Sequence, residues 1–188
     1  MALSINEIKS GVTILVESNV YVCVDAQHIK PGKGAAFVRA RLRNLKNNNI
    51  QEKTFRGDDK IEQAFVEERK LQYQYLSGGL FHFMDSDNFE EVAISEEGVG
   101  DKAKLLKDNL EIQGYFFEGN ILSISLPNFV EFNIVHTEPG IKGDTSKSGT
   151  KPAEIDTGAT IQVPLFINVG DKIKVDTRTG GTYVERVN

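Results

Sequence analysis

The chain has 188 residues, of which 39% are hydrophobic and 9% aromatic, and its formal net charge is −5. This length allows one large domain or two to three small ones, and the modest apolar content favours several small cores. No apolar run approaches the roughly twenty residues that span a bilayer, and no signal peptide is recognisable. The single cysteine, Cys23, excludes an internal disulfide. We therefore expect a cytoplasmic protein without a membrane partner.

The charge is distributed unevenly along the chain. Residues 1–64 hold ten Lys and Arg against seven Asp and Glu, a net charge of +3. Residues 65–128 have a net charge of −7 and residues 129–188 a net charge of −1. We therefore predict a basic N-terminal part that meets RNA, and an acidic middle part that faces solvent or a basic protein.

Residues 1–64 have the pattern of a small, strongly curved β-barrel, with period-two alternation and polar turns. The segment at positions 30–34, between two of its expected strands, contains Pro31 and two glycines and predicts an open hairpin loop. The glycines on either side of Lys33 allow positive φ, so the loop can hold Lys33 at its tip. The strands are expected at 13–16, 19–26, 36–43 and 51–56.

The strand after this loop predicts a basic surface. Its apolar residues point one way, while Arg39, Arg41 and Arg43 point the other, and Lys46 extends the same charge. Arginines about 6.5–7 Å apart along a strand approach the spacing of phosphates on one nucleic-acid strand. The alternative is a charged edge hairpin that only prevents aggregation. A nucleotide-binding loop is disfavoured because the Walker spacing and its hydroxyl residue are missing.

Residues 65–128 alternate again and change period once. The helical period favours a short helix at 102–108, and strands with one helix between the third and fourth suggest an OB-fold barrel. The strands are expected at 70–76, 80–84, 91–94, 111–117 and 120–125.

Residues 129–188 begin with Phe-Val-Glu, which repeats the Phe-Val-Glu run that opens the preceding part at residue 65. We therefore expect a second OB-like barrel, with a long exposed loop over 139–152. The resulting domain prediction is 1–64, 65–128 and 129–188. The strands are expected at 159–163, 165–169, 171–176 and 182–187.

No pattern of residues favours catalysis. The three histidines lie one in each part, and no zinc-ligand spacing, nucleophile motif or paired catalytic carboxylates stand out, so we expect no enzyme, no metal and no cofactor. His28 at the base of the lysine loop is compatible with either a structural role or an RNA contact. We interpret His82 as a strand residue packed among aromatic side chains.

Several motifs together resemble bacterial translation elongation factor P. The hairpin tip is formed by Lys30, Pro31, Gly32, Lys33 and Gly34 and continues to Phe37. The resemblance covers the whole chain, because further motifs follow in the order of the family. They are PGIKGDT from Pro139, GTKPA from Gly149, VPLFI from Val163 and KVDTRTG from Lys174.

The resemblance implies an SH3-like (KOW-type) barrel followed by two OB-fold barrels, in an L shape resembling tRNA. It implies a monomeric factor that binds the 70S ribosome between the P and E sites. There it would stimulate peptide-bond formation at consecutive prolines by positioning the CCA end of the P-site peptidyl-tRNA.

The resemblance also implies roles for particular residues. Lys33 would carry a β-lysyl group added by a lysyl-tRNA-synthetase-like ligase. Gly143, Asp144 and Thr145 would form the loop near the E-site codon of the mRNA. The alternative function is a general RNA-binding or single-strand-binding OB protein, with stacking platforms at Tyr73, Tyr75, Phe81 and Phe83.

Overall fold

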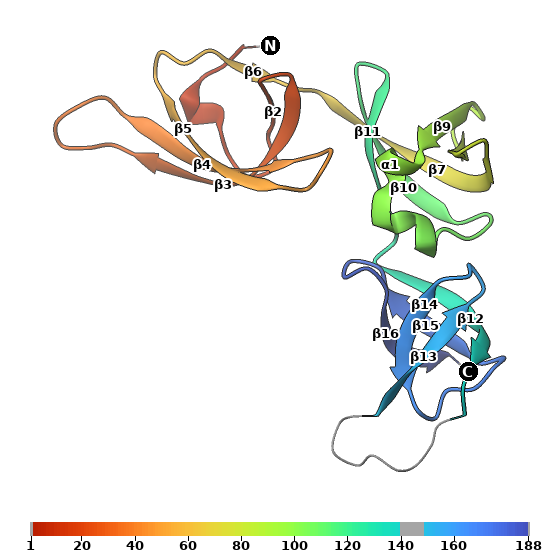
Figure 1. Ribbon diagram of the computed structural model, residues 1–188. Helices are drawn as coiled ribbons and strands as arrows, with labels where there is room; N and C mark the ends of the chain where they lie inside the picture. The colour runs from red at the N-terminus through yellow and green to blue at the C-terminus, as the bar shows by residue number, and fades with distance from the viewer. Residues whose placement is uncertain (1, 140–148, 188) are drawn as a thin grey trace. The chain divides into compact units, whose positions relative to one another are not determined.

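The protein folds almost entirely into β-strands, as the sequence predicts. The computed structural model describes residues 2–139 and 149–187, and the strands in these residues form three sheets (Figure 1). Within these ranges the helical content is limited to three short segments. The predicted mostly β fold with three strand-rich parts is therefore confirmed.

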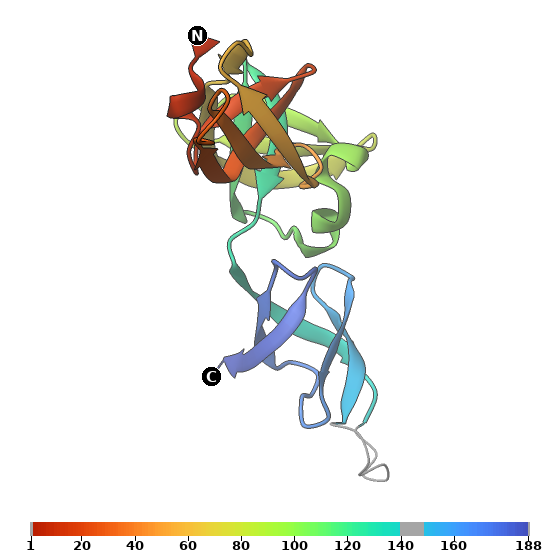
Figure 2. The ribbon, with the colours of Figure 1, turned by 90° about the vertical axis from the view of Figure 1, so that its left-hand side faces the viewer.

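The first sheet is strongly curved (Figures 1 and 2). Its strands lie in the order β1-β6-β2-β3-β4-β5. Alternate side chains point inward, so that Ile14, Val38 and Leu42 are at most 1% exposed. The sheet also contains β6, which the sequence did not predict and which pairs with both β1 and β2. The elements are β1 (Ala2–Leu3), η1 (Ile5–Glu7), β2 (Thr13–Val16), β3 (Asn19–Ile29), β4 (Phe37–Asn44), β5 (Ile50–Arg56) and β6 (Ile61–Gln63).

The second sheet has the strand order β11-β10-β7-β8-β9. Leu71, Phe83 and Leu105 are fully buried beneath it, and the ring of Tyr73 lies 5.5 Å from that of Phe83. All five strands were expected from the sequence, within a few residues at each end. They are β7 (Val66–Ser77), β8 (Leu80–Asp85), β9 (Glu91–Ser95), β10 (Glu111–Phe117) and β11 (Asn120–Ser125).

The prediction of a helix at 102–108 is wrong in both the type of helix and its position. The helical residues form one α-helical turn, α1 (Glu96–Val99), followed by the 3₁₀ helix η2 (Gly100–Leu105). The backbone N–H of Asn109 then donates to the carbonyl of Tyr73 (2.9 Å), which ties the following segment to β7. This tertiary hydrogen bond overrides the local preference for helix in the last residues of the predicted range.

The third sheet has the strand order β14-β13-β12-β15-β16. Its core side chains include Phe132, Ile155 and Ile173, none of which is exposed to solvent. Pairing of β12 with both β13 and β15 places β12 at the centre of the sheet. The strands are β12 (Phe129–Thr137), β13 (Thr150–Ile155), β14 (Thr160–Pro164), β15 (Lys172–Asp176) and β16 (Thr182–Val187).

Two predictions for the C-terminal part are wrong. Residues 165–169 form turns rather than a strand, and the backbone N–H of Ile167 donates to Pro164 (3.1 Å). The last residues of the predicted loop over 139–152 belong instead to β13. Lys151 in this strand is only 6% exposed, although its residue type and its glycine-rich surroundings favour a surface loop.

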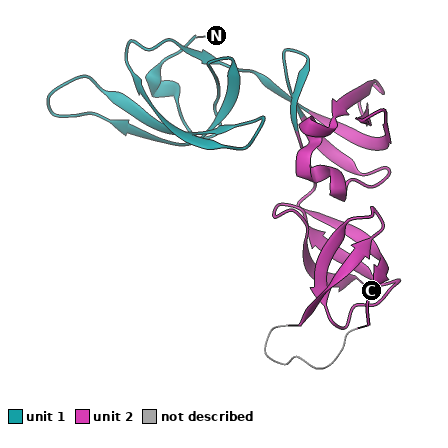
Figure 3. Ribbon diagram, in the orientation of Figure 1, with its two compact units in different colours: residues 1–68, 115–123 teal, residues 69–114, 124–188 magenta. Residues whose placement is uncertain are grey.

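Contacts divide the chain into two compact units (Figure 3). One comprises residues 1–68 and 115–123, and the other comprises residues 69–114 and 124–188. The tip of the β10–β11 hairpin therefore belongs to the first unit, although both strands are part of the second sheet. Domain boundaries after residues 64 and 128 remain our proposal.

Candidate nucleic-acid interface

The β3–β4 hairpin presents Lys33 at its tip. The last paired residues of the two strands are Ile29 and Phe37, and the loop between them extends beyond the rest of the first sheet (Figure 1). Residues 30–35 are all exposed, and no hydrogen bond or ion pair involves Lys33 among the residues that the structure describes. The Lys33 ammonium group is therefore available to a partner.

Only one of the two glycines beside Lys33 uses the conformational freedom expected of both. Gly34 has φ of +118°, whereas Gly32 is not among the residues with positive φ. A Cβ atom at position 34 would meet only the side chain of Pro31, at 3.7 Å. The requirement for glycine at position 34 therefore comes from the backbone dihedral rather than from lack of space.

Strand β4 carries the predicted arginine face. Arg39, Arg41 and Arg43 are exposed, and they alternate with three residues that are at most 1% exposed. The alternation arises because successive side chains of a strand point to opposite faces of the sheet. The structure thus brings the three guanidinium groups to one surface, although their contact with phosphates stays a prediction.

The arginine face also contains two carboxylates that the expected guanidinium ladder did not include. Asp25 on β3 and Glu52 on β5 lie opposite Arg41 in the registers of the two strand pairs. Glu52 Oε1 also lies 3.4 Å from Arg39 Nε. The stretch 26–51 lacks acidic residues, so this neutralising charge comes from positions just outside it and becomes visible only through strand pairing.

Lys46 is exposed in the turn after β4, and the buried Asn44 shapes that turn. Asn44 is 6% exposed, and its Oδ1 accepts hydrogen bonds from the backbone N–H of Lys46 (2.7 Å) and of Asn47 (3.2 Å). Sequence reasoning missed Asn44, although an Asn that opens a turn is typical of this capping of backbone N–H groups.

Replacement of Asn44 by alanine should lower the free energy of unfolding by about 1–3 kcal/mol, because it leaves two backbone donors without their partner. Urea denaturation of the full chain measures this change. Asn44→Asp retains the acceptor oxygen and should lose less stability. Equal losses in both variants would contradict the role given to the acceptor.

His28 is the next-to-last residue of β3, at the base of the lysine loop. Its Nε2 is 2.9 Å from the carbonyl oxygen of Ile8, so this nitrogen carries the proton and donates it. Of the two roles left open by the sequence, this contact favours the structural one.

Cys23 lies earlier in the same strand and is buried. Burial raises the pKa of its thiol.

Three of the four proposed stacking platforms are in the core. Tyr73, Phe81 and Phe83 are at most 7% exposed, so these rings cannot stack on bases without unfolding of the barrel. Tyr75 is 48% exposed, but its ring already stacks on His82, with 4.5 Å between the centroids. His82 in turn contacts Glu91 (2.9 Å), an acidic neighbour that opposes binding of nucleic acid. The general single-strand-binding alternative thus loses its main support.

The predicted codon loop of Gly143, Asp144 and Thr145 lies outside the described residues. Within the described ranges there is no group of three His, Cys, Asp or Glu that could hold a metal ion. In the same ranges, no helix has the length and apolar character needed to cross a membrane.

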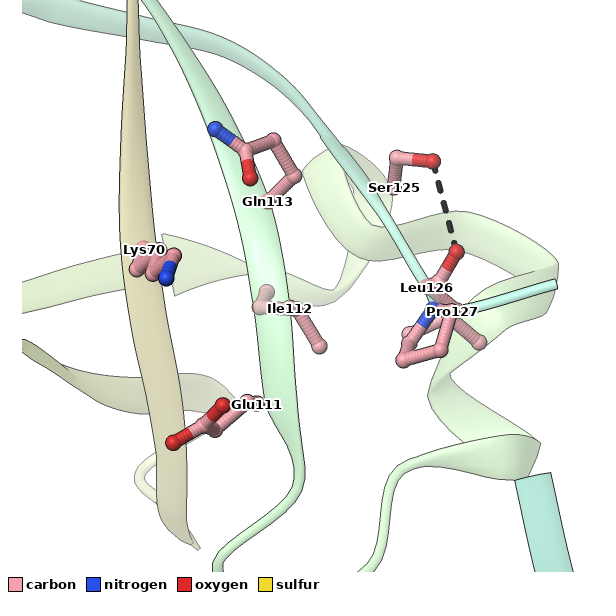
Figure 4. A pocket seen from close by; sticks show the side chains of 7 residues that line it. All are labelled: Lys70, Glu111, Ile112, Gln113, Ser125, Leu126 and Pro127. Carbon is pink, nitrogen blue, oxygen red and sulfur yellow. Dashed lines mark hydrogen bonds between the residues drawn. The ribbon is translucent and has the colours of Figure 1, made fainter. Parts of the chain in front are cut away.

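A pocket of about 260 Å³ lies in the second unit beside β10, lined by Lys70, Glu111 and Gln113 together with the segment Ser125–Pro127 (Figure 4). The hydroxyl of Ser125 donates to the carbonyl of Leu126 (3.4 Å), within this lining. The volume is slightly below the usual range for small-molecule sites, so the pocket does not indicate a cofactor.

Comparison with known families identifies the class of protein. Three family models match in succession: the Elongation factor P (EF-P) KOW-like domain at residues 4–61, the Elongation factor P (EF-P) OB domain at 66–124 and Elongation factor P, C-terminal at 130–186. They correspond to the three sheets and define a factor built from one KOW-like and two further β domains. The chain belongs to the elongation factor P family.

Individual relatives and structures agree with this assignment. Elongation factor P of Pelotomaculum thermopropionicum is 48% identical over 185 residues, which cover 98% of this chain and 100% of that protein. Elongation factor P of Natranaerobius thermophilus is 50% identical over 182 residues, covering 97% and 96% of the two chains. The structure of eukaryotic translation initiation factor 5A from Methanococcus jannaschii has a TM-score of 0.53 at 20% identity, covering 66% of this chain and 93% of that one, and supports the fold.

Proposed function

We propose that this translation elongation factor binds the ribosome between the P and E sites and stimulates peptide-bond formation at consecutive prolines. Lys33, alone or modified, would position the CCA end of the P-site peptidyl-tRNA. The observation that carries the proposal is the exposed Lys33 without an ion pair among the described residues, at the end of a hairpin in a chain of the elongation factor P family.

The physical basis of this role is positioning. Proline reacts slowly because its ring restricts φ and the approach of the reacting groups. A cationic side chain that holds the tRNA terminus in an attack-ready arrangement lowers the entropic part of the barrier. The ribosome carries out the chemistry, and the factor supplies geometry and charge.

A modification would increase the reach of Lys33. We propose a β-lysyl group, added by a lysyl-tRNA-synthetase-like ligase, because the family resemblance places the modified lysine at this position. The exposed loop is compatible with such a group. The mass of the peptide containing Lys33, from protein made in its own organism, tests this point, and an unmodified mass would contradict it.

The remaining basic residues would anchor the hairpin. Arg39, Arg41, Arg43 and Lys46 are exposed and can contact phosphates, which fix the position of a protein on RNA without reading its sequence. We propose that Gly143, Asp144 and Thr145 contact the mRNA near the E-site codon. We further propose that the factor acts as a monomer in the cytoplasm.

Arg43→Ala should weaken binding to 70S ribosomes and reduce the salt dependence of that binding. The slope of log K against log salt should fall by about 0.7–0.9 for one lost phosphate contact. Binding titrations at several salt concentrations measure the slope. The control is Arg186→Ala, which removes an exposed arginine outside this face and should leave the slope unchanged. Equal slopes for the unaltered protein, Arg43→Ala and Arg186→Ala would contradict a phosphate contact of Arg43.

The proposed function is tested in a reconstituted translation system with purified components. A template with three consecutive prolines should give full-length peptide much faster when the unaltered protein is added. A matched template without prolines should show no such difference. Equal rates on the proline template with and without the protein would refute the proposal.

A further inference from the structure

The strand registers arrange the arginine face in three cross-strand rows on β3, β4 and β5. In the row nearest the tip, Arg39 lies between two uncharged residues, Gln27 and Thr54. In the middle row, Arg41 lies between Asp25 and Glu52. In the third row, Arg43 again has uncharged neighbours, which are Val22 and Ile50.

The carboxylates reduce the charge that this face presents to RNA. Three arginines and two carboxylates leave a formal charge of +1 on the three rows. Glu52 affects two arginines, because it lies opposite Arg41 and its Oε1 is 3.4 Å from Arg39 Nε. A phosphate that approaches either arginine from the β5 side therefore meets a negative charge.

The Arg39–Glu52 pair adds little to folding. The two side chains are 48% and 58% exposed, and ion pairs this exposed contribute little to stability. The carboxylate instead places a negative charge beside the guanidinium of Arg39, which raises the cost of binding a polyanion that makes no further contacts.

We propose that Glu52 is a specificity-determining residue that suppresses binding of the arginine face to RNA in general. RNA then binds well only where further contacts, such as those of the Lys33 loop, add to those of the arginines. This inference rests on the proposed function in one respect, namely that the arginine face meets an RNA backbone.

The test is binding of the full chain to a fluorescent oligouridylate of about 20 nucleotides at salt concentrations between about 50 and 200 mM. Glu52→Gln should bind about five- to tenfold more tightly than the unaltered protein at the lowest salt. Its slope of log K against log salt should be steeper by about 0.7 for each phosphate gained. Glu52→Asp retains the charge and should restore the unaltered slope, which a merely structural role would not predict.

The matched control is Glu62→Gln, which removes an exposed carboxylate from β6 and changes the net charge by the same amount. Glu62→Gln should bind oligouridylate like the unaltered protein. Equal affinities of Glu52→Gln and Glu62→Gln would overturn the proposal, since net charge alone would then explain any change. Tighter binding by Glu52→Asp would overturn it as well.

A translation assay tests whether suppression of general RNA binding by Glu52 matters for the proposed function. In the reconstituted system, added oligouridylate should inhibit Glu52→Gln more strongly than the unaltered protein. If oligouridylate binding does not respond to Glu52 while the unaltered protein still stimulates proline synthesis, this inference fails and the proposed function stands. If the unaltered protein gives no stimulation, the proposed function fails, whatever the binding data show.

Discussion

Lys33→Ala should abolish the stimulation of peptide-bond formation at consecutive prolines and leave the free energy of unfolding unchanged. The side chain is exposed and has no ion pair or hydrogen bond among the described residues, so its removal costs the fold nothing. The same exposure allows its amine, alone or with an added group, to bring a positive charge to an RNA terminus.

Peptide synthesis on a template with three consecutive prolines measures this loss, and urea denaturation measures stability. Lys33→Arg separates two contributions, because it retains the charge but cannot be modified like a lysine. Lys9→Ala, which removes an exposed lysine from a turn of the same unit, is the matched control and should remain active. Full activity of Lys33→Ala would show that the hairpin tip does not perform the function proposed here.

Phe83→Ala should destabilise the protein by about 3–5 kcal/mol, which is a large share of the stability of a typical domain. Phe83 has no exposed surface, and its ring packs 5.5 Å from that of Tyr73 beneath the second sheet. Removal of the ring loses the free energy gained by burying it, and it leaves a cavity that the surrounding strands fill only in part.

The midpoint of urea denaturation, followed by circular dichroism, measures this effect. The matched control is Phe89→Ala, because Phe89 lies in the loop after β8 and is 72% exposed. This substitution should change the free energy of unfolding by less than about 0.5 kcal/mol. Similar losses in the two variants would contradict the distinction between a core ring and a surface ring.

Strands with strict alternation could be predicted from the sequence because one physical cause dominates them. The residues of β4 alternate between apolar and basic, and burial of one face then determines the position of every side chain. The strand β13 could not be predicted in this way. It contains Pro152 and the buried Lys151, whose ammonium group donates to the carbonyl of Glu138 (2.7 Å), just after the neighbouring strand β12.

The candidate site was predictable in its tip and not in its surroundings. A loop with Pro31 and flanking glycines predicts an exposed Lys33 from local chemistry alone. The neighbours of the arginines depend on strand register, which places Asp25 and Glu52 beside Arg41 from two other strands. Register follows from packing of the whole sheet, so a reading of one strand cannot supply it.

The β3–β4 hairpin has a consequence for the order of events in the cell. All residues from Lys30 to Ala35 are exposed in the folded chain, and the strands that hold them are fixed by the first sheet. If Lys33 carries the proposed modification, an enzyme that adds it would need no unfolding of its substrate and could use the folded hairpin as a recognition element. We therefore expect that the proposed modification would follow folding, so that folded but unmodified factor could receive it without new synthesis.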